Sequence, residues 1–248
     1  MKQILISIQA LLLICYPIYS SAQDSGLNWA AMDTSSNYMF GKLRGEEYLI
    51  TTEASIYHFL YEDFYTGTVT LADDVVVENI KIRYLAYRDN LISYNFKTFA
   101  QFCKLDKNTI KEFTIEETKS SGEIKHHKFI KLHYQYSIIN KNRYFEELYS
   151  GNIMLLAFHR VIKDHVHNYI DKFGLELDDR YRLKTNYYIY SGENKFVKIE
   201  SKKRLFLKTF NNNKQEVKRL LRQNKINFRK DGSMTEAIKL IDKAGLLN

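Results

Sequence analysis

The spacing of the apolar residues changes near residue 200, and this change constrains the fold more than any other feature of the sequence. Before it, runs rich in β-branched and aromatic residues are separated by short polar turns, as in residues 67–71, 75–87 and 180–190. Such runs are typical of antiparallel strands. After it, apolar residues recur every three to four positions, as in amphipathic helices. The sequence therefore predicts an α+β protein with a mainly antiparallel β body, a sandwich or a barrel-like sheet, followed by a small C-terminal helical segment.

The individual elements follow from the same spacing. Further strands are expected at residues 48–52, 91–94, 110–115, 129–138, 144–149, 153–161 and 195–199. A short helix is expected over residues 202–210, and Asn213 is placed to cap the next one. Ser233 and Glu236 have the spacing of a capping box for a last helix, and Gly245 has the position of its C-terminal stop.

The N-terminal segment has the pattern of a secretory signal peptide. Lys2 precedes a mostly apolar run over residues 4–14, Pro17 breaks the helix after it, and a small-residue cleavage site ends at Ala22. We therefore expect export, to the periplasm or the medium, after cleavage near Ala22. The expected organisation is a signal peptide at 1–22, a loosely ordered lead-in at 23–47, an antiparallel β-rich domain at 48–200 and a C-terminal helical cap at 201–248.

Cysteine usage is consistent with a protein stabilised by its core. Cleavage would remove Cys15 and leave Cys103 alone, so neither an internal disulfide nor a disulfide-linked partner is expected. Cys103 lies among aromatic residues, and we interpret it as a small buried apolar side chain.

Several of these segments resemble a known group of proteins. Residues 61–71, 77–84 and 144–156, with the helical residues 202–210, 217–224 and 238–241, are similar to uncharacterised secreted proteins of Bacteroidota-type bacteria. The likeness covers residues 48–248, and Asp74 stands where that group tends to carry a turn glycine. The resemblance implies an exported β-rich protein and no particular activity.

Three histidines are the first candidates for chemistry. His159, His165 and His167 would share one face if they lay on one continuous strand, and imidazole pairs on a strand can bind zinc or copper. No cysteine or clearly placed glutamate completes a tetrahedral set. We therefore predict histidines without a metal, and no cofactor.

Other polar clusters carry no recognisable catalytic pattern. The paired acids at 116–117 and 146–147 are interpreted as solvated residues at turns and strand edges, and His126 and His127 as a polar turn or strand edge. The sequence motifs of serine hydrolases, zinc proteases and nucleotide-binding loops are missing. No catalytic residue is predicted, and we lean towards a protein that is not an enzyme.

Two groups of residues are candidates for binding. The net charge of +8 is concentrated in residues 201–230, which hold eleven lysines and arginines and one acid. Lys218, Arg219 and Arg222 are expected on a solvated helix face, with weak contact to an anionic envelope surface as the alternative and no role for nucleic acid. Tyr181, Tyr188 and Tyr190 are expected to pack across strands, or else to line a groove for a sugar or an apolar ligand.

These observations leave three hypotheses for function. The first is a non-catalytic envelope protein with a binding or structural role and an unknown partner. The second is a carrier of lipid-like molecules in a pocket between sheet and helices. The third is a hydrolase with an unrecognised site.

Overall fold

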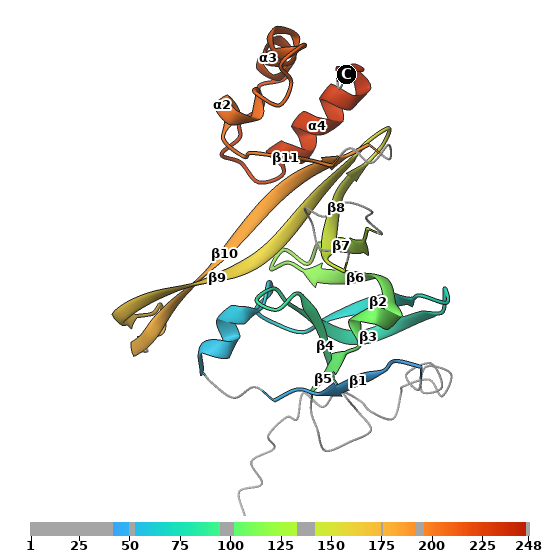
Figure 1. The fold of residues 1–248 in the computed structure, drawn as a ribbon, viewed down its shortest axis with the longest axis vertical. Coiled ribbons are helices and arrows are strands. Elements are labelled where there is room, and N and C mark those ends of the chain that lie inside the picture. The colour runs from blue at the N-terminus through green and yellow to red at the C-terminus, as the bar shows by residue number, and fades with distance from the viewer. Residues whose placement is uncertain are drawn as a thin grey trace, which may run out of the picture.

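The computed structural model describes residues 42–49, 53–94, 102–132, 142–174, 176–191 and 196–246. In these residues eleven strands form one antiparallel sheet, in the spatial order β1-β5-β4-β3-β2-β6-β7-β8-β9-β10-β11 (Figure 1). The first seven strands are β1 (Gly45–Glu47), β2 (Tyr65–Leu71), β3 (Val76–Leu85), β4 (Asn90–Tyr94), β5 (Phe102–Leu105), β6 (Ile110–Thr118) and β7 (Ile124–Lys131). The last four are β8 (Tyr144–Ser150), β9 (Met154–Ile170), β10 (Glu176–Tyr190) and β11 (Phe196–Ile199). The predicted α+β class, with an antiparallel body before a helical segment, is confirmed.

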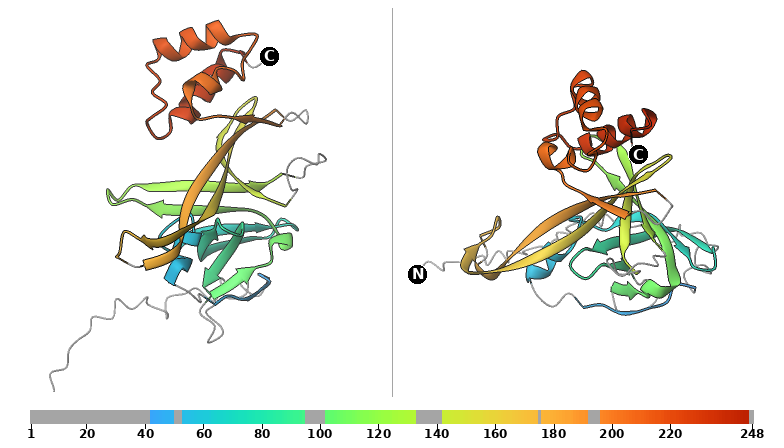
Figure 2. Two further views of the ribbon diagram at one scale, coloured as in Figure 1. Left: turned by 60° about the vertical axis from the view of Figure 1, so that its left-hand side comes forward. Right: turned by 45° about the horizontal axis from the view of Figure 1, so that its top comes forward.

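Strands β9 and β10 form a hairpin that is much longer than the other strands. It runs from the C-terminal helices past the other strands, and its far end projects from the body (Figures 1 and 2). The sheet curls so strongly that the end of β3 comes back to this hairpin. The contact is a hydrogen bond of 3.4 Å from the Val161 amide to the carbonyl of Ala86, the residue after β3. The sheet therefore has a concave inner face and a convex outer face.

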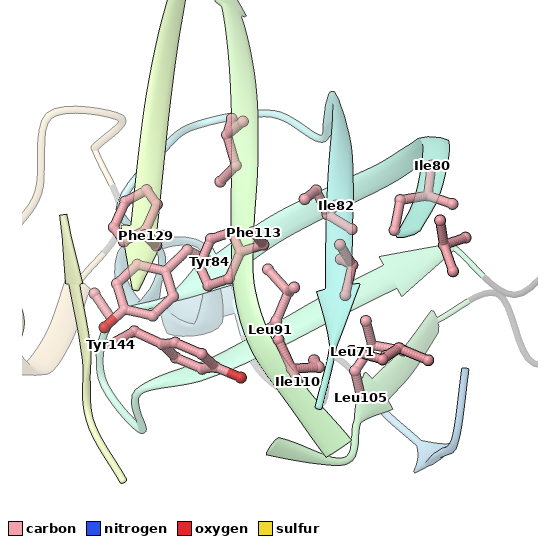
Figure 3. Packing of buried hydrophobic residues seen from close by; sticks show 14 of the residues in the cluster. Leu71, Ile80, Ile82, Tyr84, Leu91, Leu105, Ile110, Phe113, Phe129 and Tyr144 are labelled. Atoms are coloured by element: carbon pink, nitrogen blue, oxygen red, sulfur yellow. The ribbon is translucent and has the colours of Figure 1, made fainter. Parts of the chain in front are cut away.

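The main core fills one end of the concave face. Tyr84, Phe113, Phe129 and Tyr144 are almost fully buried and lie against one another among aliphatic side chains (Figure 3). Phe113 and Phe129 stack with ring centroids 4.7 Å apart on the neighbouring strands β6 and β7. Side chains of alternate residues meet here because period-2 alternation places every second residue on the same face.

A second apolar cluster joins the helices to the sheet. The helices are α2 (Lys203–Phe206), α3 (Lys214–Gln223) and α4 (Ser233–Lys243). Their buried residues Phe206, Leu221 and Ile238 share one cluster with Leu155 of β9 and Ile189 of β10. The helices therefore contact the concave face of the hairpin directly, and in the described residues none of them is long and apolar enough to cross a membrane.

Three of the expected elements differ from the structure. The first strand lies at Gly45–Glu47, within the segment expected to be a loose lead-in, and Tyr48 and Leu49 are not in a strand; residues 50–52 lie outside the described part. The capping-box prediction is wrong, because Gly232 is the N-cap of α4 and no side chain caps it. The helix expected at 202–210 is a single turn, Lys203–Phe206, followed by turns.

Other local predictions agree with the structure. Gly245 ends α4 with a φ of 64°, and its amide donates to the Asp242 carbonyl. Asp74 adopts a φ of 63°, a left-handed conformation in which glycine is least strained. The expected signal peptide and the second half of the strand expected at 129–138 lie outside the described residues.

Candidate functional site

A ladder of five polar side chains crosses the concave face, with one residue from each of five adjacent strands. We call it the polar ladder; from β6 to β10 it consists of Glu117, His127, Glu146, His159 and Thr185. Glu146 lies opposite Phe129 of β7 and Ala157 of β9 in the strand register. His127 and His159 lie two positions further along those strands and face the same side of the sheet as Glu146. Both imidazoles can therefore reach the Glu146 carboxylate.

The ladder is hydrogen-bonded along its whole length. Glu146 accepts from His127 Nδ1 at 2.5 Å through one oxygen and from His159 Nε2 at 2.6 Å through the other. His127 Nε2 lies 3.0 Å from a Glu117 oxygen, and His159 Nδ1 lies 2.9 Å from the Thr185 hydroxyl. His127, Glu146 and His159 are only 5%, 7% and 9% exposed. The Tyr61 ring covers His127, with ring centroids 5.2 Å apart.

The chemistry of the ladder follows from these contacts. A carboxylate only accepts hydrogen bonds, and His127 lies between two carboxyl groups, with Glu146 at Nδ1 and Glu117 at Nε2. The Thr185 hydroxyl can donate or accept, so it can pair with His159 in either protonation state. All four ring nitrogens of the two histidines have a hydrogen-bond partner within the ladder. No group of three or more potential ligands that could hold a metal ion occurs in the described residues.

Protonation of Glu146 is coupled to folding. Burial alone would raise the pKa of Glu146, but the hydrogen bonds from His127 and His159 lower it to about 2. A carboxyl whose pKa is lower in the folded state stabilises the fold above its unfolded pKa, near 4.5.

We expect this stabilisation, about 3 kcal/mol, to disappear as the pH falls from 5 to 2. The measurement is the free energy of unfolding in urea at several pH values. Glu146→Gln should reduce the slope between pH 5 and pH 2, whereas Glu123→Gln, at an exposed site, should leave it as in the wild type. An equal slope in the wild type and Glu146→Gln would contradict the coupling.

The outer face of the β9–β10 hairpin carries a strip of positive charge. We call this the outer basic strip; it consists of Arg143, Arg160, Arg180, Arg182 and Lys184. Arg160 and Lys184 are exposed and lie directly opposite each other in the register. Arg182 pairs with Asp164 at 2.6 Å, whereas within the described residues Arg160 and Lys184 form no ion pair. The Arg143 guanidinium lies 4.8 Å from the centre of the Phe158 ring, beside Arg160 on this face.

The three histidines that were considered as candidate metal ligands do not come together in the structure. His159 belongs to the polar ladder, whereas the His165 side chain is 82% exposed and pairs with Asp179 at 2.7 Å. The two residues share a face but lie six positions apart on β9, which is about 20 Å along a strand. The side chain of His167 lies outside the described part.

The candidate binding residues also lie in different parts of the structure. Tyr181 lies on the concave side and contacts His58 and Tyr87, with ring centroids 4.7 Å and 6.0 Å away. Tyr188 and Tyr190 lie on the outer side, where Tyr188 stacks on Phe196 at 4.5 Å. The three tyrosines therefore line no common groove. Lys218, Arg219 and Arg222 are exposed on α3, opposite the buried Val217 and Leu221.

Three members of the polar ladder, Glu117, Glu146 and His127, were expected at turns or strand edges, and the last two of them are buried. Glu146 was interpreted as a solvated strand-edge residue and His127 as part of a polar turn or edge; the structure overturns both, since each lies inside a strand and is buried. The alternation of inward and outward residues along β7 and β8 already indicated that both side chains are buried. Glu146 occupies the same parity as the core residue Tyr144, and His127 the same parity as Phe129, so both point inward.

A groove of about 490 Å³ lies away from the ladder, between the start of the described chain and the β2–β3 turn. Its lining is Lys42, Arg44, Leu71, Ala72, Asp73, Asn108 and Thr109. Among the described residues that line it there is one carboxyl group and no histidine, so these residues do not form the acid and base pair of a common hydrolytic site.

Comparison with known proteins gives no relative: no protein-family model, no curated protein and no solved structure matches the chain. The polar ladder and the outer basic strip are therefore the two features from which a function can be inferred.

Proposed function

We propose that this protein is an exported, non-catalytic binding module that attaches to an anionic surface of the bacterial envelope through the outer basic strip. The observation that supports the proposal is the cross-strand pair Arg160 and Lys184. Like charges directly opposite each other in a sheet are destabilising. An anionic partner offsets this repulsion, so the pair is better suited to a bound state than to an isolated one.

The two alternatives have less support. A carrier needs open space between sheet and helices, where this protein packs Phe206, Leu221 and Ile238 against the hairpin. A hydrolase is favoured by one arrangement: Thr185, His159 and Glu146 follow the order of nucleophile, imidazole and carboxylate. His159 is nevertheless 9% exposed in the inner face of a sheet. Covalent labelling of Thr185 by a fluorophosphonate probe would favour the hydrolase over the binding module.

Co-sedimentation with vesicles tests the proposal. At low salt, the protein without its signal peptide should bind phosphatidylcholine vesicles in which roughly one lipid in three is phosphatidylglycerol, and should not bind pure phosphatidylcholine. The double variant Arg160→Gln/Lys184→Gln should bind about 30-fold more weakly, because each cation near an anionic surface contributes about 1 kcal/mol. Binding should also weaken steeply with salt, since the charges are exposed.

The matched control removes two charges elsewhere. Lys218→Gln/Arg219→Gln lowers the net charge equally, on the exposed face of α3. We expect this variant to bind nearly as well as the wild type. An equal loss in both double variants would mean that net charge, and not the outer basic strip, determines attachment. Absence of wild-type binding at low salt would refute the proposal outright.

A further inference from the structure

We infer that Arg160 and Lys184 form a clamp for a phosphomonoester group, and that the Thr185–His159 end of the polar ladder positions this clamp. The inference rests on the proposed function and names the lipid chemistry that the outer basic strip would recognise. The preferred target would be a membrane lipid with a terminal phosphate, such as phosphatidic acid.

The charge of the site favours a dianion. Directly opposed residues in an antiparallel pair have Cβ atoms about 5 Å apart, so both cationic groups can converge on one ligand. A phosphomonoester carries a charge of about −1.5 to −2 and three acceptor oxygens. It can neutralise both cations and accept two parallel hydrogen bonds from the arginine fork. A phosphodiester carries a single charge and matches only one of the two cations.

The surroundings leave this pair available. Asp164, the acidic residue on the same face of β9, is engaged by Arg182 at 2.6 Å. Phe158, two residues before Arg160, faces the same side and is covered by Arg143. The pair therefore lies between an ion pair that is already satisfied and a buried aromatic ring whose outer side is already occupied by Arg143.

The polar ladder lies directly behind the clamp. Thr185 follows Lys184, His159 precedes Arg160, and these two ladder residues also face each other in the register. Their hydrogen bond of 2.9 Å fixes the two strands at the point where the outer charges repel. Glu146 holds His159 through its other nitrogen at 2.6 Å. Thr185 and His159 are thus positioning residues: they keep the two cations opposed without touching the ligand.

The experiment compares two vesicle compositions, phosphatidic acid and phosphatidylglycerol, each mixed into phosphatidylcholine to the same measured zeta potential. The wild type should bind the phosphatidic acid vesicles about tenfold more tightly, the effect of one additional charge-assisted contact. Lys184→Gln should lose this preference. Lys218→Gln, which removes an exposed cation on α3 away from the outer basic strip, should retain it.

Thr185 variants test the positioning role. Thr185→Ser keeps the hydroxyl and should keep the preference for phosphatidic acid. Thr185→Val keeps the shape without the hydroxyl and should reduce the preference towards that of Lys184→Gln, while its circular dichroism spectrum and cooperative melting show that it is folded. The ratio of the two affinities is informative because a uniform loss of folded protein weakens both equally.

The outcomes separate the two proposals. If the wild type binds both vesicle types equally, the clamp is refuted and attachment through the outer basic strip stands. If it binds neither, the proposed function itself fails. If Thr185→Val retains the full preference, the positioning role of the ladder is refuted.

Discussion

Replacing Glu146 with alanine is expected to lower the free energy of unfolding by about 3–5 kcal/mol, the largest single-site effect that we predict. The substitution removes the acceptor for hydrogen bonds from His127 and His159, both of which are buried. Buried donors without an acceptor cost the full desolvation of each group. The measurement is chemical denaturation at pH 7, followed by circular dichroism.

An exposed glutamate provides the control. Glu123 pairs with Lys119 at 3.0 Å, but its side chain is 64% exposed. Glu123→Ala should therefore cost less than about 1 kcal/mol. If Glu146→Ala were as stable as Glu123→Ala, the polar ladder would contribute nothing to folding. The double variant Glu146→Ala/His159→Ala should be less destabilised than the sum of the single variants, because the two side chains share a hydrogen bond.

The β body could be predicted because its strands obey local rules. Residues 67–71 and 75–87 alternate between apolar and polar positions and are separated by a turn of small polar residues, and the structure places β2 and β3 there. The length of the hairpin could not be predicted in the same way. Residues 162–179 are rich in charged residues, and the register shifts between Leu177 and Asp179. The alternation of apolar and polar residues is therefore lost where the strands extend beyond the core.

The polar ladder could not be read from any local motif. Its five members are spread from residue 117 to residue 185, one on each strand, and they meet only through the order and register of β6 to β10. Along the chain His159 groups with His165 and His167, its neighbours in sequence. Its actual partners, Glu146 and Thr185, are neighbours across the sheet.

The buried polar ladder and the exposed basic strip occupy opposite faces of the same β9–β10 hairpin. Burial of the inner face specifies the register of the two strands, but apolar contacts are not directional, and the outer face carries like charges at Arg160 and Lys184. The hydrogen bond between Thr185 and His159 provides directional contact at that position. The polar ladder therefore stabilises a surface that would otherwise be unfavourable, which is the reason for connecting it with binding.

Leu221→Ala should lower the free energy of unfolding by about 2–5 kcal/mol, whereas Arg219→Ala on the same helix should change it by less than about 0.5 kcal/mol. Leu221 is fully buried in the cluster that joins α3 to Phe206, Ile238 and Ile189 of β10, so truncation leaves a cavity beneath the helices. Arg219 is exposed on the opposite side of α3. Denaturation followed at 222 nm (a wavelength that reports on helix, about 220 nm) and by tyrosine fluorescence distinguishes helical loss from unfolding of the β body. If Leu221→Ala unfolds with wild-type stability by both signals, the helices do not depend on this contact with the hairpin, and the second cluster is not a core.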